Sequence, residues 1–458
     1  MMKDELMKLD EKSRRDFMSA VAKASLGVSA SFLAGCSLAD TETVQKPADP
    51  AAPGFNPVPE EDPTGTLSAS QLNGKPTAKN IIYIYLAGGM THVDTFDPKP
   101  GKKDVMGPTN VIGTNVDGIQ VGHWLEKTAK HMDKVAVINS LSTTQGAHAQ
   151  GNYFMHTSYT KRASIRHPRM GTWISKLSGP ANKDLPASVF IGSDSVGGGA
   201  GFLPSKFGSL GIGDPEEGLQ NSKRPKGVSE SEFNKRLELA SFLDTSFHSK
   251  HEAKQVQAYT DMYTDALRMM NSEDLKGFNI KSEPESMKRH YGNSKFGKGA
   301  LLARRLVEHG VRFVELSSGG WDMHNNIQEN LAEKMATFDH VYAALLSDLA
   351  MRGMLEETMV VVATEFGRTP EISSNAGRNH FPKAFSCTLA GGGIVGGQKY
   401  GKTDEQARNV IENKVSVPDF NATIAYGMGL PYNEIIYSPS KRPFTVADTG
   451  TPLVNLFG

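Results

Sequence analysis

Short apolar runs alternate with longer amphipathic segments in the second half of the chain. The runs Val311–Leu316 and Met359–Thr364 are rich in β-branched residues, as expected of strands buried on both faces. Before and between them, Ala300–His309 and Gln328–Met351 have helical periodicity, and a glycine closely follows each. This order predicts a β-α-β crossover, and therefore a parallel sheet with helices on both faces.

Further segments extend this pattern. Ile81–Leu86, Val135–Ile138 and Phe385–Leu389 are short apolar runs of the kind found in buried strands. The strand pattern fades over residues 194–289, where polar helical stretches take over. The sequence therefore predicts an α/β fold over residues 81–458, with a mainly parallel sheet sandwiched by helices and a helical insertion at 194–289.

The first 36 residues follow the pattern of an export signal. Arg14 and Arg15 precede a weakly apolar stretch, Ala20–Gly35, as in twin-arginine signals. The stretch ends in Leu33-Ala34-Gly35-Cys36, which resembles a bacterial lipoprotein box whose cysteine is acylated. We therefore expect the twin-arginine export machinery as a partner, and membrane contact only through a lipid on Cys36. The alternative is an ordinary amphipathic helix with a chance arginine pair.

The next stretch, residues 37–80, is rich in Pro, Ala, Asp, Glu and Thr and has no apolar periodicity. This composition predicts a flexible tether. Ser37, rather than aspartate, after the acylated cysteine favours the outer membrane by the sorting rule of Gram-negative bacteria. We expect the folded part on the periplasmic side of the cell envelope or at the cell surface.

Composition narrows the class of function. The chain has 50 Lys+Arg and 50 Asp+Glu, so its formal charge is zero and a general nucleic-acid surface is not supported. No window of about twenty residues is uncharged and apolar enough for a permanent membrane span. Cys36 and Cys387 are the only cysteines, which excludes a disulfide framework and a multi-thiolate zinc site. Cys387 lies in an apolar run and is expected to be a small buried hydrophobe.

Polar residues gather after the predicted strands. In open α/β sheets, ligands bind at the carboxyl ends of the strands. Carboxylates and neutral imidazoles suit a divalent metal, and arginines suit anions. The alternative is a polar loop in which histidine and aspartate cap each other. The candidates are Asp322, His324, Glu365, Arg368, Arg378 and His380.

Two other clusters follow predicted strands. After the second strand, His148 lies at a predicted helix start and is a better functional candidate than His156, which we expect to be a satisfied helix histidine. After the first strand, Asp94 and Asp97 are either ligands or turn residues leading into Pro98.

Two glycine motifs do not predict nucleotide binding. Gly391-x-Gly393-x-x-Gly396 fits a dinucleotide fingerprint, and Gly396-x4-Gly401-Lys402-Thr403 fits a phosphate-binding loop. The two overlap, no convincing apolar helix follows either, and an exported protein meets no ATP pool. No Gly-x-Ser-x-Gly elbow occurs, which weakens a serine-hydrolase interpretation.

Five segments of the chain match a known bacterial pattern: Gly88–Pro100, Ala303–Val314, Gly320–His324, Thr364–Pro370 and Ala390–Gly393. Together they resemble the family called domain of unknown function 1501. The resemblance covers nearly all of the chain after the tether. It implies the fold of the alkaline phosphatase and sulfatase superfamily, whose members hydrolyse phosphate or sulfate esters with metals and a covalent nucleophile.

The resemblance also implies site residues. Asp322, with His324 or Asn326, resembles the aspartate and histidine of one metal site, and His380 resembles the downstream histidine of that site. Glu365 takes the place of the aspartate in the superfamily's Asp-His pair, as a ligand or general base.

The chain departs from the superfamily pattern at several positions. Phe366 stands where the histidine of the pair would be, and Gly88 and Gly89 replace the acidic residues expected after the first strand. His148 falls at the place of the nucleophile, and it is either a nucleophile or a third imidazole ligand.

The expected function is a lipid-anchored metal-dependent hydrolase of a phosphate or sulfate ester, with a small anionic ester or a glycan as partner. One divalent ion, zinc, manganese or calcium, is the expected cofactor, and Arg368 and Arg378 are the expected anion clamps. The alternative is a non-catalytic envelope protein that binds a glycan or a protein partner, since fold alone does not carry function.

Overall fold

A computed structural model describes residues 75–192, 199–220, 222, 227–248, 265–270 and 272–458. The export signal with Arg14, Arg15 and Cys36, and most of the predicted tether, lie outside these residues. No helix among the described residues is long and apolar enough to cross a membrane. The chain divides into two compact units, residues 73–219 with 243–458, and residues 1–72 with 220–242.

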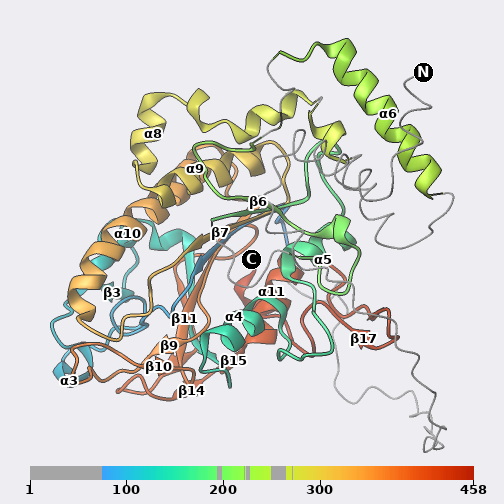
Figure 1. Cartoon of the computed structure of the whole chain (residues 1–458). Helices are drawn as coiled ribbons and strands as arrows, with labels where there is room; N and C mark the ends of the chain where they lie inside the picture. Colours follow the sequence, from blue (N-terminus) through green and yellow to red (C-terminus); the bar gives the residue numbers. More distant parts are fainter. Residues whose placement is uncertain (1–74, 193–198, 221, 223–226, 249–264, 271) are drawn as a thin grey trace, which may run out of the picture. The chain divides into compact units, whose positions relative to one another are not determined.

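The larger unit is built on a nine-stranded sheet (Figure 1). Its strands are β1 (Asn80–Leu86), β4 (Val135–Ser142), β5 (Ser188–Ile191), β6 (Leu210–Ile212), β7 (Phe313–Ser318), β8 (Thr358–Ala363), β11 (Phe385–Ala390), β12 (Gln398–Tyr400) and β15 (Val415–Ser416). The order is β12-β4-β11-β8-β1-β7-β5-β6, with β15 also beside β4. All pairings are parallel except those of β11, which runs antiparallel to β4 and β8. The predicted mainly parallel sheet is confirmed.

Helices cover both faces of this sheet, as predicted. The main helices of the larger unit are α4 (His148–Thr157), α5 (Met170–Leu177), α8 (Glu285–Tyr291), α9 (Lys295–Glu308), α10 (Ile327–Met351) and α11 (Val417–Gly427). Figure 1 shows α9 and α10 on one side of the sheet and α4, α5 and α11 on the other. Alternate side chains of β1 explain the two layers. Ile82 and Ile84 join the apolar core formed with α9 and α10, whereas Tyr85 contacts the ring of His156 on α4.

Smaller elements surround the sheet. They are the helix α3 (Lys103–Met106) and the two-stranded pairs β2–β3 (Val111–Gly113, Gln120–Gly122), β9–β10 (Gly367–Arg368, His380–Phe381), β13–β14 (Lys402–Thr403, Val410–Glu412) and β16–β17 (Ile436–Tyr437, Pro443–Phe444). The β9–β10 pair matters for the site because it carries Arg368 opposite His380.

Helix α9 begins five residues before the predicted start, because the side chain of Ser294 accepts a hydrogen bond from the backbone N–H of Gly297. Helix α6 (Glu230–His248) lies in the range 194–289 and is capped by the preceding Ser229, which forms reciprocal hydrogen bonds with Glu232. The same range also contains β6, which pairs with β5, so it is not helical throughout. Three residues, Leu-Gly-Ile, are too short a run to give a strand signal in the sequence.

The end of the predicted tether is attached to the folded part. The backbone N–H of Lys75 donates to Gly458, that of Thr77 to Gly392, and that of Ala78 to Gly427. The folded part therefore begins no later than Lys75 among the described residues, and the more N-terminal part of the tether stays a prediction.

His167, in the loop between α4 and α5, is a buried neutral histidine. The hydroxyl oxygen of Tyr153 accepts the backbone N–H of His167 at 2.7 Å and lies 2.7 Å from its Nδ1. Because that oxygen already accepts one hydrogen bond, its own proton is placed to donate to Nδ1. Burial, with a smaller contribution from the charge of Arg162, lowers the pKa of His167 to about 4.

This burial predicts a pH-dependent stability. The unfolded chain takes up a proton at His167 below about pH 6.5, and the folded chain takes it up only near its lower pKa. The free energy of unfolding should therefore decrease as the pH is lowered from about 6.5 to about 4, and His167 should account for about 3 kcal/mol of this decrease. Urea denaturation of wild type and His167→Gln across this range measures the difference. Equal pH slopes for the two proteins would contradict the assignment.

Candidate metal centre

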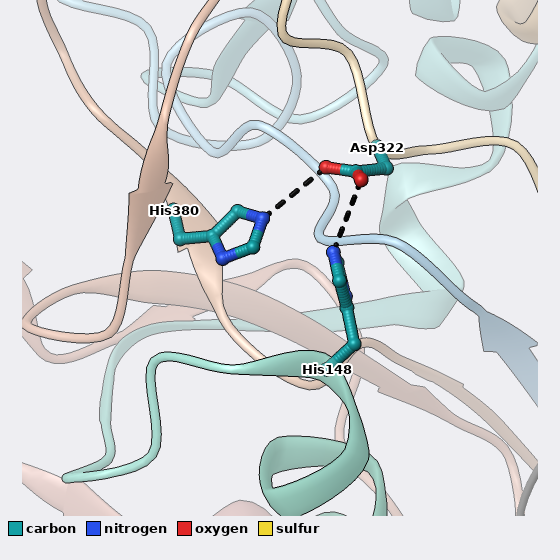
Figure 2. Close-up of side chains that lie close together, drawn as sticks. All are labelled: His148, Asp322 and His380. Carbon is teal, nitrogen blue, oxygen red and sulfur yellow. Dashed lines mark hydrogen bonds and ion pairs between the residues drawn. The ribbon is translucent and has the colours of Figure 1, made fainter.

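A cluster of polar side chains lies at the carboxyl ends of the central strands. His148 is the first residue of α4, just after β4, and Asp322 lies in the loop after β7. Glu365 follows β8, and His380 lies in β10. Figure 2 shows the side chains of His148, Asp322 and His380 pointing toward one another from these three separate segments. The prediction that these strand ends bring their polar residues together agrees with this arrangement.

Asp322 is the hub of the cluster. Its Oδ2 lies 3.2 Å from Nε2 of His148, and its Oδ1 lies 2.9 Å from Nε2 of His324 and 3.2 Å from Nε2 of His380. The Nε2 atoms of His324 and His380 are 3.0 Å apart. Three imidazoles thus direct Nε2 at the carboxylate of Asp322, His148 at Oδ2 and the other two at Oδ1. Ligand atoms of His148, Asp322 and His380 all lie within 4.8 Å of one another, and His324 flanks this group.

The outer nitrogen of each imidazole faces an oxygen. Nδ1 of His148 lies 2.8 Å from Oε1 of Glu365, and Nδ1 of His380 lies 2.8 Å from the carbonyl oxygen of Gly146. Nδ1 of His324 lies 3.1 Å from Oδ1 of Asn379. Since these oxygens accept, each Nδ1 is placed to donate, and a neutral imidazole in this tautomer has the lone pair of its Nε2 free to bind a cation.

This donor set fits a divalent cation. Zinc binds imidazole nitrogen and carboxylate oxygen at about 2.0–2.2 Å, so the donors of a tetrahedral site lie about 3.3 Å apart. The inward atoms here are separated by 2.9–3.2 Å along the contacts with Asp322. Nε2 of His148 is also buried, and it forms no hydrogen bond although Oδ2 of Asp322 lies 3.2 Å away, so this nitrogen is available to bind a cation. His148, Asp322 and His380 therefore form a group that can hold a metal ion.

The electrostatic setting keeps the carboxylate ionised. Burial alone would raise the pKa of Asp322, but the hydrogen bond and the charge of Arg368, with His148 and His324, lower it to about 2. The hydrogen bond to Glu365 raises the pKa of His148, and burial lowers that of His380. The side chain of Asp322 is nonetheless 45% exposed, so the cluster is accessible from solvent.

Glu365 lies behind His148 and does not face the carboxylate of Asp322. Its Oε1 accepts from Nδ1 of His148 and, at 2.8 Å, from the backbone N–H of Gly88. Its Oε2 lies 3.0 Å from the hydroxyl of Tyr85. The structure thus places this residue, predicted as a ligand or general base, as a positioning residue that fixes the tautomer of His148.

The side chain of Arg368 is completely buried, and it holds the loops of the site together. Its Nε donates to the carbonyl of Gly89 at 3.1 Å, and Nη1 donates to that of Arg378 at 3.0 Å. Nη2 donates to the carbonyl of Gly88 and to Oδ1 of Asp322. Arg368 therefore fixes the hub carboxylate, and the predicted role of anion clamp does not match its placement.

Arg378 lies outside the cluster, although its carbonyl contacts Arg368. Its buried guanidinium binds both oxygens of Asp94, at 2.8 and 3.1 Å. It also donates to the carbonyl of Val105 at 2.8 Å, and to those of Thr369 and Pro370. Arg378 and Asp94 therefore form a buried ion pair, and neither is placed as an anion clamp or a ligand. Asp97 likewise binds Lys99 at 2.9 Å, away from the cluster.

The departures from the superfamily pattern have steric reasons here. Gly88 has a φ of +128°, and a Cβ atom on it would lie 2.4 Å from the backbone nitrogen of Asp322. Phe366 is fully buried, and its ring lies 5.1 Å from that of His148 and 4.6 Å from that of His380. The ring of Phe366 thus forms an apolar wall beside the imidazoles of His148 and His380, and the backbone of Asp322 lies too close to Gly88 for a side chain there.

Two other histidine questions are settled by placement. Nδ1 of His156 donates to the carbonyl of Asn152 at 2.7 Å, and its Nε2 lies 2.9 Å from Oε1 of Glu315, so both nitrogens have a partner, as expected of a satisfied helix histidine. Asn326 is the left-handed N-cap of α10, so His324 rather than Asn326 joins Asp322. Two partners of the histidines were not predicted. Gly146 has no side chain to indicate a role, and the one signal for Asn379 was its position beside His380.

Cys387 is buried in β11, and burial raises the pKa of its thiol to about 12. At pH 8 only about one thiol in ten thousand is then ionised, so we expect no reaction with a thiol-specific reagent in the native state. Protein lacking residues 1–36 has Cys387 as its single cysteine, and should react fully once it is unfolded in urea. Rapid labelling of the native protein would contradict this burial.

A family model described as protein of unknown function, DUF1501, matches residues 78–457. The chain belongs to this family. A sequence search of curated proteins finds no significant match. The resemblance to this family that the sequence motifs indicated is confirmed.

Solved structures that resemble this DUF1501 chain are hydrolases and a synthase. The sulfatase PsFucS1 from Pseudoalteromonas sp. has 13% identity and a TM-score of 0.42, covering 84% of this chain and 73% of that chain. The lipoteichoic acid synthase LtaP from Listeria monocytogenes has 10% identity and a TM-score of 0.38, covering 85% and 79%. A phosphonate monoester hydrolase from Silicibacter pomeroyi has 11% identity and a TM-score of 0.35, covering 82% and 76%. At these TM-scores the likeness says nothing about the chemistry of the cluster, which rests on its own geometry.

Proposed function

We propose that this chain is an exported, lipid-anchored, metal-dependent hydrolase of phosphate or sulfate esters. The observation that carries the proposal is the convergence of three imidazole Nε2 atoms on the carboxylate of Asp322, each with its Nδ1 bound to an oxygen. Such outer hydrogen bonds orient metal-binding histidines. The export and lipid signals around Arg14, Arg15 and Cys36 support a place in the cell envelope, with the outer membrane favoured.

The donor set favours some metals over others. Three nitrogens and one carboxylate suit zinc, and also manganese, better than calcium, which prefers six to eight oxygens. A bound divalent ion would act as a Lewis acid toward the oxygens of the ester. We therefore propose one zinc or manganese ion per chain, held by His148, Asp322, His324 and His380.

The protein side chains have distinct tasks in this proposal. Glu365 keeps the proton of His148 on Nδ1, so His148 acts as a ligand rather than as a nucleophile. Arg368 holds Asp322 in place and keeps it ionised. Phe366 excludes water from the side of the cluster that faces the protein. A small ester or the ester group of a glycan would approach from the solvent-exposed side of Asp322.

The test uses protein without residues 1–36, stripped of metal and then loaded with zinc, manganese or calcium. We expect about one zinc or manganese ion per chain by elemental analysis, and ester hydrolysis only in the loaded form, lost with a chelator and restored by the metal. Aryl sulfates and aryl phosphates are suitable substrates. No metal in any preparation would refute the metal centre. Full metal occupancy without turnover would support the alternative of a non-catalytic binding protein, which the substitution at Phe366 also favours.

A further inference from the structure

We infer that the centre selects esters whose reacting group carries one negative charge, namely sulfate monoesters and phosphodiesters, over dianionic phosphate monoesters. This inference rests on the proposed function and narrows its substrate class. The inference follows from the net charge of the cluster and from the number of hydrogen-bond donors that are free to bind the second negative charge of a dianionic ester.

The first step is the charge of the cluster. Asp322 and Glu365 are carboxylates that accept from donors around them, and Arg368 is the one guanidinium in contact with Asp322 among the described residues. Together they carry one net negative charge, which a divalent cation converts to one net positive charge. A monoanionic ester neutralises this centre, whereas a dianionic one leaves an unpaired negative charge beside two carboxylates.

The second step is the use of the arginine donors. A guanidinium has five N–H groups. Those of Arg368 face the carbonyls of Gly88, Gly89 and Arg378, Oδ1 of Asp322 and, at 3.4 Å, Nε2 of His324.

Those of Arg378 are likewise all directed at protein oxygens. They face both oxygens of Asp94 and the carbonyls of Val105, Thr369 and Pro370. Arg378 therefore has no free donor for a further anionic oxygen, and Arg368 has at most the one Nη1 N–H that faces His324 when that nitrogen binds a metal. The bidentate recognition that favours phosphate dianions is thus not available from either arginine.

Another cation, Lys334, contacts the loop that carries Asp322. Nζ of Lys334, on α10, donates to the carbonyl of Gly319 at 3.1 Å, three residues before Asp322. Its contact is exposed to solvent, where water and salt screen its charge. It therefore adds a weak long-range attraction for any anion and does not discriminate strongly between one and two charges.

Binding of stable analogues tests the inference without turnover. Benzenesulfonate and the monomethyl ester of phenylphosphonate carry one charge, and phenylphosphonate carries two at alkaline pH. Titration calorimetry with zinc-loaded protein lacking residues 1–36 should show both monoanions binding about tenfold more tightly than the dianion, a difference of about 1.4 kcal/mol. Equal or tighter binding of the dianion overturns the inference.

A charge variant makes the test independent of overall affinity. Glu365→Gln removes one negative charge and should shift the monoanion-to-dianion affinity ratio about tenfold toward the dianion, measured at confirmed full zinc occupancy. Glu365→Asp keeps the charge and should keep the ratio. Glu357→Gln, at the opposite end of β8, is the matched control for the same substitution and should also keep it. An unchanged ratio in Glu365→Gln overturns the inference.

The two proposals fail in different ways. Protein that takes up no zinc refutes the proposed function and the inference with it. Zinc-loaded protein that prefers the dianion refutes only the inference. If the monoanions bind more tightly, the turnover of an aryl sulfate compared with that of a diaryl phosphate distinguishes the two monoanionic substrate classes.

Discussion

Replacing His380 by alanine is expected to lower the affinity of the protein for zinc at least a hundredfold. Nε2 of His380 lies 3.2 Å from Asp322 and 3.0 Å from Nε2 of His324, so its loss removes one of the four converging donors. Loss of an outer hydrogen bond alone costs about 10–100-fold in metal affinity, and loss of a ligand should cost more. Competition with a chromophoric chelator measures the dissociation constant directly.

A second readout and two controls accompany this experiment. Zinc should raise the melting temperature of the wild type, and a hundredfold weaker affinity removes about 2.7 kcal/mol of that stabilisation. His131→Ala removes a histidine from the 3-10 helix before β4, and should leave the affinity unchanged. The zinc affinity of Glu365→Gln should lie between those of His380→Ala and His131→Ala, because this substitution disturbs only the orientation of His148. Wild-type zinc affinity in His380→Ala would place the metal elsewhere.

Replacing Arg378 by methionine is expected to destabilise the metal-free protein by about 3–5 kcal/mol. The guanidinium is fully buried and binds both oxygens of Asp94, so its removal leaves a buried carboxylate without its counter-charge. Urea denaturation monitored by fluorescence or circular dichroism gives the free energy of unfolding.

A matched control tests whether the loss of stability depends on the burial of the ion pair. Arg408 forms an ion pair with Glu371 in which both side chains are about half exposed. Arg408→Met should cost less than about 1 kcal/mol, as exposed pairs do. If Arg378→Met were as stable as wild type but bound anionic esters less tightly, the original interpretation of Arg378 as an anion clamp would be restored.

The sequence predicted five of the nine strands of the sheet, β1, β4, β7, β8 and β11, and the four residues that meet at the carboxylate of Asp322, for a single physical reason. Parallel strands end at one edge of the sheet, so residues that follow them meet there even when they are far apart in the chain. His148 and Asp322 are separated by 174 positions and meet because β4 and β7 run in the same direction. The reversed direction of β11 was not predictable, since an apolar run has no signal for its direction.

The roles of the arginines could not be predicted in the same way. Residue type shows that Arg368 and Arg378 can bind anions, but not which acceptors already surround them. The carbonyls of Gly88, Gly89 and Pro370 come from turns whose geometry the sequence pattern does not specify. The contact of Glu365 with Nδ1 of His148 could not be predicted for the same reason, because it depends on the relative positions of two segments that are 217 residues apart in the chain.

The close contact between Gly88 and the backbone of Asp322 also limits what evolution can do with this scaffold. An acidic residue at position 88 would overlap the backbone of Trp321 and Asp322, and would disturb the hub of the cluster. Phe366 would have to change as well before the opposite side could accept a charged ligand. Acidic ligands for a further cation on this side would therefore require both a rearrangement of the loop at Gly88 and a change at Phe366.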